Sequence, residues 1–315
     1  MVASLEQITR IPGGMTFKML NEEGNFVVVP GVPVLIKGKV VLVRDPEMVA
    51  KYEGVNVVGT MPSGIVYPAR AGDSGQIILI DGLYRGGESL TNNDMLEAAQ
   101  KQVALGEPRP LSILDGHHVL MQNFKAHKNK AYNFLVDRIK EIGSVAHQRA
   151  FRFATFTQFK PLGEASTIQH YRLDGTVTEG GAYTLEIPEG TQRVSKFWSY
   201  VVLAPQQSAS RLGHTSAISS TVRPTLEAFL GENLEQAGAA YQLHSPPLSN
   251  GDLREVRFWL PTAQNRNFTG SFLDSGGSGG WFDLGPGSGH CGVRPAFAGA
   301  QKISAGNEGY VQCAK

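Results

Sequence analysis

Acidic side chains in the last third of the chain are the residues best suited to catalysis. Asp252, Asp274 and Asp283 lie close together in the sequence. Two carboxyl groups that face one another across a cleft hydrolyse glycosidic bonds, one as the acid and the other as the base or nucleophile. These three residues are therefore the candidates for a glycan-acting hydrolase. Whether any two of them face one another depends on the fold.

Two segments contain a serine that could serve as a catalytic nucleophile. Gly72 to Gly75 reads Gly-Asp-Ser-Gly, which is similar to the nucleophile loop of trypsin-like proteases. That machinery needs His, Asp and Ser in this order, and the first histidine of the chain, His117, follows Ser74. The second segment, Asp274 to Gly277, lies in a Ser-Gly-Gly repeat that is typical of a flexible loop. We expect no catalysis at either serine.

Asp115, His117 and His118 form the one local group of possible metal ligands that we weigh. Adjacent histidines point to opposite faces of a strand and diverge on a helix, so they rarely share one ion. We interpret the three as polar residues at a turn after Leu114. The Gly-rich phosphate-binding patterns are absent where a strand leads into a helix. The sequence therefore predicts no metal and no cofactor.

Composition favours a strand-rich protein that assembles with other subunits. Of 315 residues, 41% are hydrophobic, only 18% are charged and 37 are glycine, and the net charge is +1. Few charges with many glycines suit strands joined by tight turns, or surfaces buried against neighbours. Residues 125–160 hold eight Lys or Arg and two acidic residues. We interpret them as a solvated face or a surface for an acidic subunit, and do not expect nucleic acid as a partner.

No apolar run is long enough to span a bilayer, and no charged and then apolar leader follows Met1. We therefore expect neither a membrane partner nor a classical secretory signal. The two cysteines, Cys291 and Cys313, lie near the C-terminus. They can form one bridge that closes the tail or stay as two free thiols.

The pattern predicts a mainly β protein with a few helices, an α+β fold. Strands are expected at 26–44, where they form a hairpin, and at 77–80, 151–155, 183–187 and 197–203, with a further hairpin at 171–178 around Asp174-Gly175. Helices are expected at 91–105, 129–142 and 224–240. We divide the chain into a β-rich assembly domain, a helix-containing connector and a β-rich C-terminal domain, at 1–110, 111–165 and 166–315.

The C-terminal segment carries the motifs with a recognisable pattern. Phe258 to Thr262 reads Phe-Trp-Leu-Pro-Thr, a polar glycine-rich run follows, and Trp281 to Leu284 reads Trp-Phe-Asp-Leu. The segment closes on Cys291 to Phe297, Cys-Gly-Val-Arg-Pro-Ala-Phe. This arrangement resembles the end of the C-type-lectin-like, formylglycine-enzyme-like domains of many phage and bacterial surface proteins. Pro261-Thr262 replaces the Arg-Ser common in such domains, and no calcium-dependent sugar-binding signature occurs.

The resemblance implies a structural component of a bacteriophage virion, in the tail tip, baseplate, fibre or capsid surface, and not an enzyme. Such a protein assembles with other virion proteins and with copies of itself, with a trimer as the expected assembly. Its terminal loops would meet a host receptor, a glycan or a neighbouring subunit. The expected loop face consists of Arg266, Asn267, Phe268, Asp274 and Trp281. The expected structural residues are Trp259, Arg294, Cys291 and Cys313. The alternatives are the glycan hydrolase and a purely structural decoration or joining protein.

Overall fold

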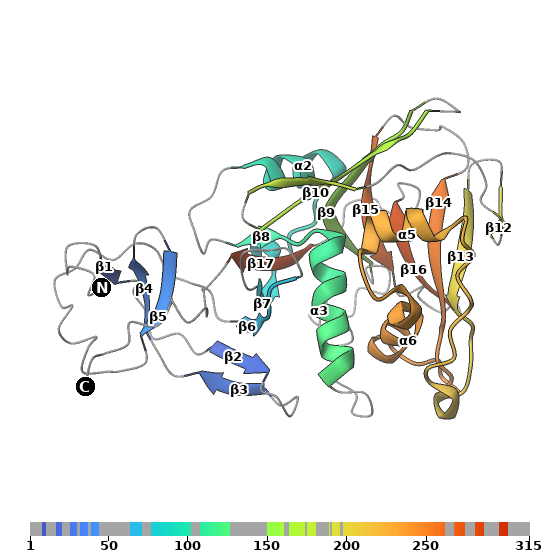
Figure 1. Ribbon diagram of the computed structural model, residues 1–315, viewed down its shortest axis with the longest axis horizontal. Helices are drawn as coiled ribbons and strands as arrows, with labels where there is room; N and C mark the ends of the chain where they lie inside the picture. Colours follow the sequence, from blue (N-terminus) through green and yellow to red (C-terminus); the bar gives the residue numbers. More distant parts are fainter. Residues whose placement is uncertain are drawn as a thin grey trace.

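A computed structural model gives the protein a mixed α+β fold (Figure 1). It describes residues 8–10, 17–20, 26–29, 32–36, 39–43, 64–70, 77–101, 108–126, 150–160, 164–173, 175–180, 189, 191–195, 198–261, 268–274, 281–286 and 296–301. Over these residues four α-helices accompany an eight-stranded, a six-stranded and a three-stranded sheet. The predicted α+β class is confirmed at this level.

The eight-stranded sheet has the order β11-β10-β9-β15-β16-β14-β13-β12. Its strands are β9 (Ala150–Gln158), β10 (Thr167–Tyr171), β11 (Val177–Glu179), β12 (Gln192–Arg193), β13 (Trp198–Ala204), β14 (Glu255–Pro261), β15 (Phe268–Asp274) and β16 (Trp281–Pro286). All neighbours are antiparallel except β14 and β16, which are parallel. The C-terminal segment thus supplies three strands, β15, β16 and β14, to the middle of the sheet.

Alternation along the strands gives this sheet two different faces. In β14, Val256, Phe258 and Leu260 are fully buried, and Phe258 lies 5.4 Å from the ring of Phe229 in α5 (Arg223–Leu230). Helices α3 (Ile113–Ala126), α5 and α6 (Leu234–His244) pack on this face and complete the larger core (Figure 1). Successive strand residues point to opposite faces, so Arg257 and its alternate neighbours lie on the other, outer face.

The six-stranded sheet has the order β3-β2-β6-β7-β17-β8. Its strands are β2 (Phe17–Leu20), β3 (Phe26–Val29), β6 (Gly64–Tyr67), β7 (Ile77–Leu83), β8 (Arg109–Pro110) and β17 (Phe297–Gln301). The closing strand β17 lies between β7 and β8, antiparallel to both. The sheet therefore joins the end of the predicted C-terminal domain to residues far upstream. The predicted division into three domains stays a prediction.

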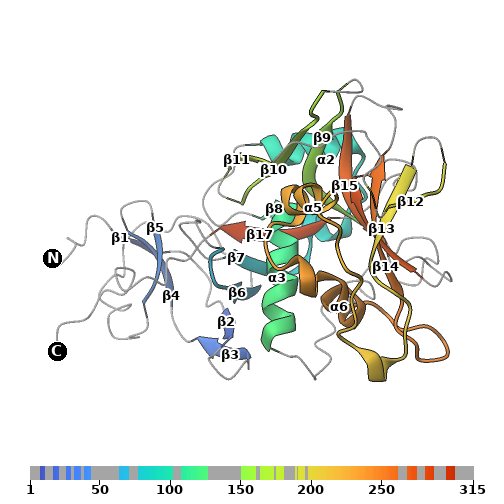
Figure 2. The same ribbon diagram turned by 45° about the vertical axis from the view of Figure 1, so that its right-hand side comes forward.

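The third sheet consists of β1 (Ile8–Arg10), β4 (Val32–Ile36) and β5 (Lys39–Val43), in the order β1-β4-β5. It lies at one end of the molecule, and β12 to β14 lie at the opposite end (Figures 1 and 2). Strands β4 and β5 pair antiparallel, with Ile36 opposite Lys39, so the predicted hairpin at 26–44 is confirmed for this part. The run at 26–29 does not belong to it, because β3 pairs with β2 in the six-stranded sheet.

Helix α2 (Asn92–Gln100) begins where the sequence predicts. Thr91 caps it: its hydroxyl accepts from the Asp94 amide at 3.2 Å, and the Asp94 carboxylate accepts from the Thr91 amide at 2.8 Å. This reciprocal pair satisfies two amides that the first turn leaves open. The helix ends at Gln100, earlier than the predicted Leu105.

Two helix predictions are corrected. Residues 224–240 form two helices and not one, because Gly231 (φ 75°) and Asn233 (φ 66°) break the run between α5 and α6. The expected turn after Leu114 is wrong, since these residues belong to α3. The predicted helix at 129–142 and the strand at 183–187 lie outside the described residues.

The strand predictions are confirmed with small shifts of their ends. β9 and β13 fall where alternation predicts them, and β7 continues through Asp81-Gly82 to Leu83 instead of ending at Ile80. The hairpin around Gly175 pairs Tyr171 with Val177. Gly175 has φ +82°, a conformation that L side chains rarely adopt, which explains the Asp-Gly signal.

Candidate functional site

Two residues of the predicted loop face, Arg266 and Asn267, lie outside what the structure describes, as do three of the predicted structural residues, Cys291, Arg294 and Cys313. Phe268 begins β15 and Asp274 ends it. Six residue steps of an extended strand separate them by roughly 20 Å. Trp281 begins β16, at the same end of the sheet as Asp274. The structure thus groups Asp274 with Trp281 and leaves Phe268 at the opposite end.

Two of the three candidate carboxylates become neighbours. Asp274 of β15 and Asp283 of β16 are direct antiparallel partners, and they share the outer face. Directly opposed residues have Cβ atoms about 5 Å apart. Asp252 lies in the turn before β14, where its carboxylate accepts from the Asn250 amide group at 2.9 Å. It is not part of this pair.

Asp283 has an unusual environment for a carboxyl group. The residue is only 8% exposed, and its Oδ1 has no hydrogen-bond partner among the described residues. Burial raises the pKa of Asp283 to about 7, against the lowering effects of a hydrogen bond from the Trp259 side chain and of the Arg257 charge. The nearby carboxylates of Asp274 and Glu255 raise it further. Asp283 therefore exchanges a proton near neutral pH.

Aromatic and charged side chains surround Asp283. The Arg257 guanidinium lies 4.5 Å from the centre of the Tyr200 ring, and its Nε donates to Glu255 at 2.5 Å. The rings of Tyr200 and Trp259 are 5.2 Å apart. We call Tyr200, Glu255, Arg257, Trp259, Asp274 and Asp283 the outer-face patch.

The outer-face patch is held in a fixed geometry while part of it stays accessible. The Tyr200 hydroxyl donates to Gln192 at 2.7 Å, which ties β13 to the edge strand β12. The side chains of Arg257 and Glu255 are 19% and 24% exposed. Such a patch combines ring surface, a guanidinium and three carboxyl groups that can contact one polar ligand.

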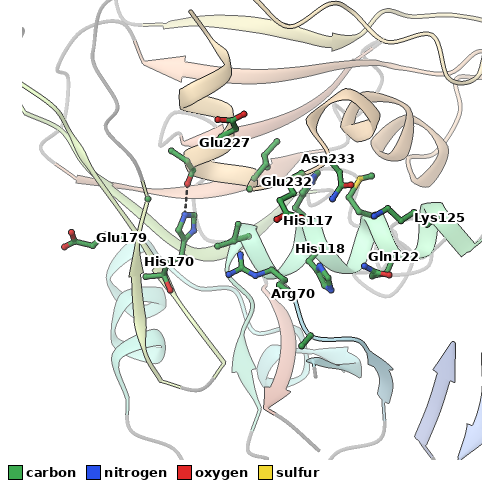
Figure 3. Close-up of a pocket in the computed structure, with 18 residues that line it drawn as sticks. Arg70, His117, His118, Gln122, Lys125, His170, Glu179, Glu227, Glu232 and Asn233 are labelled. Atoms are coloured by element: carbon green, nitrogen blue, oxygen red, sulfur yellow. Dashed lines mark hydrogen bonds between the residues drawn. The ribbon is translucent and has the colours of Figure 1, made fainter. Parts of the chain in front are cut away.

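A cavity of about 450 Å³ is a second candidate site (Figure 3). It lies between α3, the end of α5 with the turn into α6, strands β10 and β11, and residues 69–70. Cavities that hold small ligands have volumes of this order. Its lining mixes apolar and polar side chains, among which Figure 3 labels the polar ones.

Two buried histidines line the cavity and bind the carbonyls that end α5. His170 Nε2 donates to the Ala228 carbonyl at 2.8 Å (Figure 3), so its Nδ1 accepts from the Thr155 hydroxyl at 2.9 Å. His117 Nε2 donates to the Glu232 carbonyl at 3.1 Å. Helix ends leave carbonyls without intrahelical partners, and these rings satisfy them.

Both histidines are held neutral. Burial lowers the pKa of His117 and of His170 to about 4, and their carbonyl bonds only partly offset this. Positive neighbours lower each value further, His118 beside His117, and Arg172 and Arg70 beside His170. The two rings therefore add no charge to the floor of the cavity at neutral pH.

The structure separates the three residues that we weighed as metal ligands. Asp115 points away from the cavity into a buried ion pair with Arg172, at 2.7 Å, and also accepts from the Ser112 hydroxyl. His118 Nε2 donates to the Pro68 carbonyl at 2.9 Å. Among the described residues no three His, Cys, Asp or Glu side chains come together as cation ligands.

Sequence reasoning found part of the outer-face patch and, of the cavity, only His117 and His118, which it weighed as metal ligands. Glu255, Arg257 and Trp259 occupy alternate positions of one strand, and this alternation is a signal that could have placed them on one face. The cavity combines α3 with residues near 70, 170 and 230, and no spacing within the sequence brings these together.

Comparison of the chain with protein-family models, with curated protein sequences and with solved structures gives no match. Over the described part of the chain, no helix has the length and apolar character needed to cross a membrane.

Proposed function

We propose that the protein is a structural component of a bacteriophage virion that assembles with copies of itself and displays the outer-face patch for recognition. The N-terminal strands β1, β4 and β5 would belong to the attachment region. The patch would bind a receptor, glycan or neighbouring virion protein. The resemblance of the C-terminal segment and the low share of charged residues support this proposal.

One observation carries the proposal: the small N-terminal sheet and the outer-face patch lie at opposite ends of the molecule. In both views β1, β4 and β5 lie at one end, and β13 and β14 lie at the other (Figures 1 and 2). A protein that docks through one end can present the other end to a ligand without competition between the two contacts. This separation suits attachment and display.

The end of the C-terminal segment is placed differently from what the resemblance implies. The resemblance assigns a closing strand to the segment that ends at Phe297. Phe297 begins β17, which belongs to the six-stranded sheet and not to the sheet of β14, β15 and β16. Its ring stacks on Phe151 of β9 at 4.2 Å and so ties the six-stranded sheet to the larger core. The pairing of β17 therefore adds no support to the C-type-lectin-like resemblance.

The mass of the full-length chain in solution tests the proposal. Light scattering should give a trimer or a larger closed ring that persists on dilution, because virion components assemble with symmetry. Arg257→Gln in the outer-face patch should leave that mass unchanged, since the patch lies away from the attachment end. A monomer at every concentration would contradict the proposal.

A glycan-acting hydrolase is the second candidate, and the Asp274–Asp283 pair favours it. Retaining glycosidases hold two carboxyl groups about 5 Å apart and keep one of them protonated near neutral pH. Purified protein would then release reducing ends from bacterial polysaccharide. Asp283→Asn and Asp274→Asn should each abolish this release, and Asp252→Asn, outside the pair, should not. No release from any polysaccharide would dismiss the hydrolase.

A further inference from the structure

The half-buried polar side chains of the cavity are all hydrogen-bond donors or cations. Arg70, His118, Gln122 and Asn233 line its walls, and Lys125 stands exposed at its edge. In Figure 3, Arg70 and His118 lie in the middle of the view beside the two buried histidines. Arginine forks and amide groups suit ligands rich in oxygen acceptors.

The acidic residues of the cavity are at its rim. Glu179, Glu227 and Glu232 are all exposed to solvent. Figure 3 shows Glu179 at the left of the view and Glu227 in its upper part, both apart from Arg70 and His118, and Glu232 beside His117. Solvent screens the charges of these exposed glutamates more than that of the half-buried Arg70.

The apolar part of the lining limits the size and type of ligand. Leu114, Met121 and Leu230 are at least nine-tenths buried and form continuous apolar surface in a volume of about 450 Å³. This volume can hold a small molecule built on a single ring, but it cannot enclose a polymer. An inorganic ion alone would leave most of it unfilled.

We propose that this cavity binds a small hydroxyl-rich molecule that carries an oxyanion, a carboxylate or a phosphate group. The Arg70 guanidinium and His118 meet the oxyanion, and Lys125 adds charge at the entrance. Gln122 and Asn233 bind hydroxyl groups, and the rim glutamates accept from hydroxyls that face solvent. The inference goes beyond the proposed function and does not depend on it.

The buried histidines support this proposal through charge. Burial is the main cause that lowers the pKa of His170, and the charges of Arg172 and Arg70 lower it further. An anion bound at Arg70 would offset the effect of the Arg70 charge. It should therefore raise the pKa of His170, although the ring nitrogens of His170 stay bonded to Thr155 and Ala228.

Isothermal titration calorimetry with four probes tests the proposal on the full-length protein. The probes are glucose 6-phosphate, glucuronate, inorganic phosphate and glucose. We expect glucose 6-phosphate or glucuronate to bind with a dissociation constant of about 1 mM or lower. The stronger of these two arms identifies the oxyanion as phosphate or carboxylate. Glucose should bind at least tenfold more weakly, because it lacks the charge.

Three variants localise the binding. Arg70→Gln and Lys125→Gln should each weaken binding, the first by tenfold or more and the second by less, since Lys125 is exposed. Lys125→Gln keeps the test valid if the arginine variant misfolds. Arg211→Gln is the matched control, because Arg211 is an exposed arginine that does not line the cavity.

Histidine resonances provide a second measurement that a remote binding site would not affect. Saturating ligand should move the titration of His170 to higher pH. Failure of all charged probes to bind at roughly 10 mM, equal binding of glucose, or full affinity in both cavity variants would each overturn the proposal. Oligomeric mass is unaffected by these outcomes, so the cavity and the proposed function fail separately.

Discussion

Asp283→Asn should make the protein more stable at alkaline pH. The carboxyl group is 8% exposed and its Oδ1 has no partner among the described residues, so its ionised form is poorly solvated. Asparagine has nearly the same shape and keeps an oxygen that accepts from Trp259. The substitution therefore removes a buried charge while it preserves the packing.

The magnitude follows from linkage between proton binding and folding. Burial raises the pKa of Asp283 from 3.8 to about 7, so the folded state binds its proton more tightly than the unfolded chain. The associated stability is fully present below pH 4 and is lost as the pH rises through 7. Three pKa units correspond to about 4 kcal/mol. The loss is about 1.5 kcal/mol at pH 5 and about 4 kcal/mol at pH 8.5.

The measurement is urea unfolding of both proteins at pH 5 and at pH 8.5, followed by far-ultraviolet circular dichroism. The free energy of unfolding of the variant minus that of the native protein should increase by about 2.5 kcal/mol from pH 5 to pH 8.5. This double difference cancels the intrinsic effect of the amide and the titration of every other group. Asp252→Asn, at a turn outside the outer-face patch, serves as the matched control.

An advantage that stays constant within about 0.5 kcal/mol, or that widens toward acid, would refute the reasoning. The first result would mean that solvent reaches Asp283 freely, and the second that a cation holds it ionised. An equal response of Asp252→Asn would show that the effect belongs to overall charge and not to the buried site.

Three other predictions concern stability. The free energy of unfolding should fall by about 2 kcal/mol for each of His117 and His170 when the pH falls from 7 to 5. Their lowered pKa values keep the folded rings neutral while the unfolded chain takes up protons. Urea unfolding in the Asp283→Asn background measures this loss without the contribution of Asp283. Gly238→Ala should lower stability by about 1–3 kcal/mol in thermal unfolding, because its Cβ would clash with the backbone carbonyl of Leu203 in β13. Thr91→Ala should cost about 1 kcal/mol in the same assay through loss of the α2 cap.

Each of these three has a result that would contradict it. A stability that is flat between pH 7 and pH 5 would mean that the histidine rings reach solvent. Gly82→Ala is the control for Gly238, since no atom lies within 4 Å of its added Cβ, and equal losses at both sites would remove the steric argument. An unchanged melting temperature for Thr91→Ala would show that water replaces the cap.

Local chemistry explains which elements the sequence predicts. Thr91 and Asp94 cap α2 by a contact three residues apart, and Gly175 sets the hairpin within its own turn. The break between α5 and α6 was missed because the apolar pattern continues across it, although Gly231 ends α5 and Asn233 precedes α6, both at positive φ. Helix α3 carries the same Ser-x-x-Asp signal at Ser112 that marks other helix starts. Ser112 and Asp115 therefore predict the start of α3 from the sequence alone.

The residues of the two candidate sites can be selected partly by local features of the sequence, but their grouping depends on long-range contacts. Asp274 and Asp283 could be selected by residue type, but their pairing depends on the register of β15 against β16. Tyr200 joins them only because β13 pairs with β14 across more than fifty intervening residues. The cavity depends wholly on such long-range contacts, since α3 reaches β10 and the end of α5 through folding alone.

The buried ionisable groups of the two sites differ in how their polar atoms are satisfied. His170 has both ring nitrogens bonded and stays neutral, so folding costs little at neutral pH and the ring stabilises α5. Asp283 has an oxygen without a partner and loses stability when it ionises. Asp283→Asn would remove this cost. A buried carboxyl group with a strongly raised pKa is a candidate for function, so the proton or the charge of Asp283 is the feature of the outer-face patch to test first.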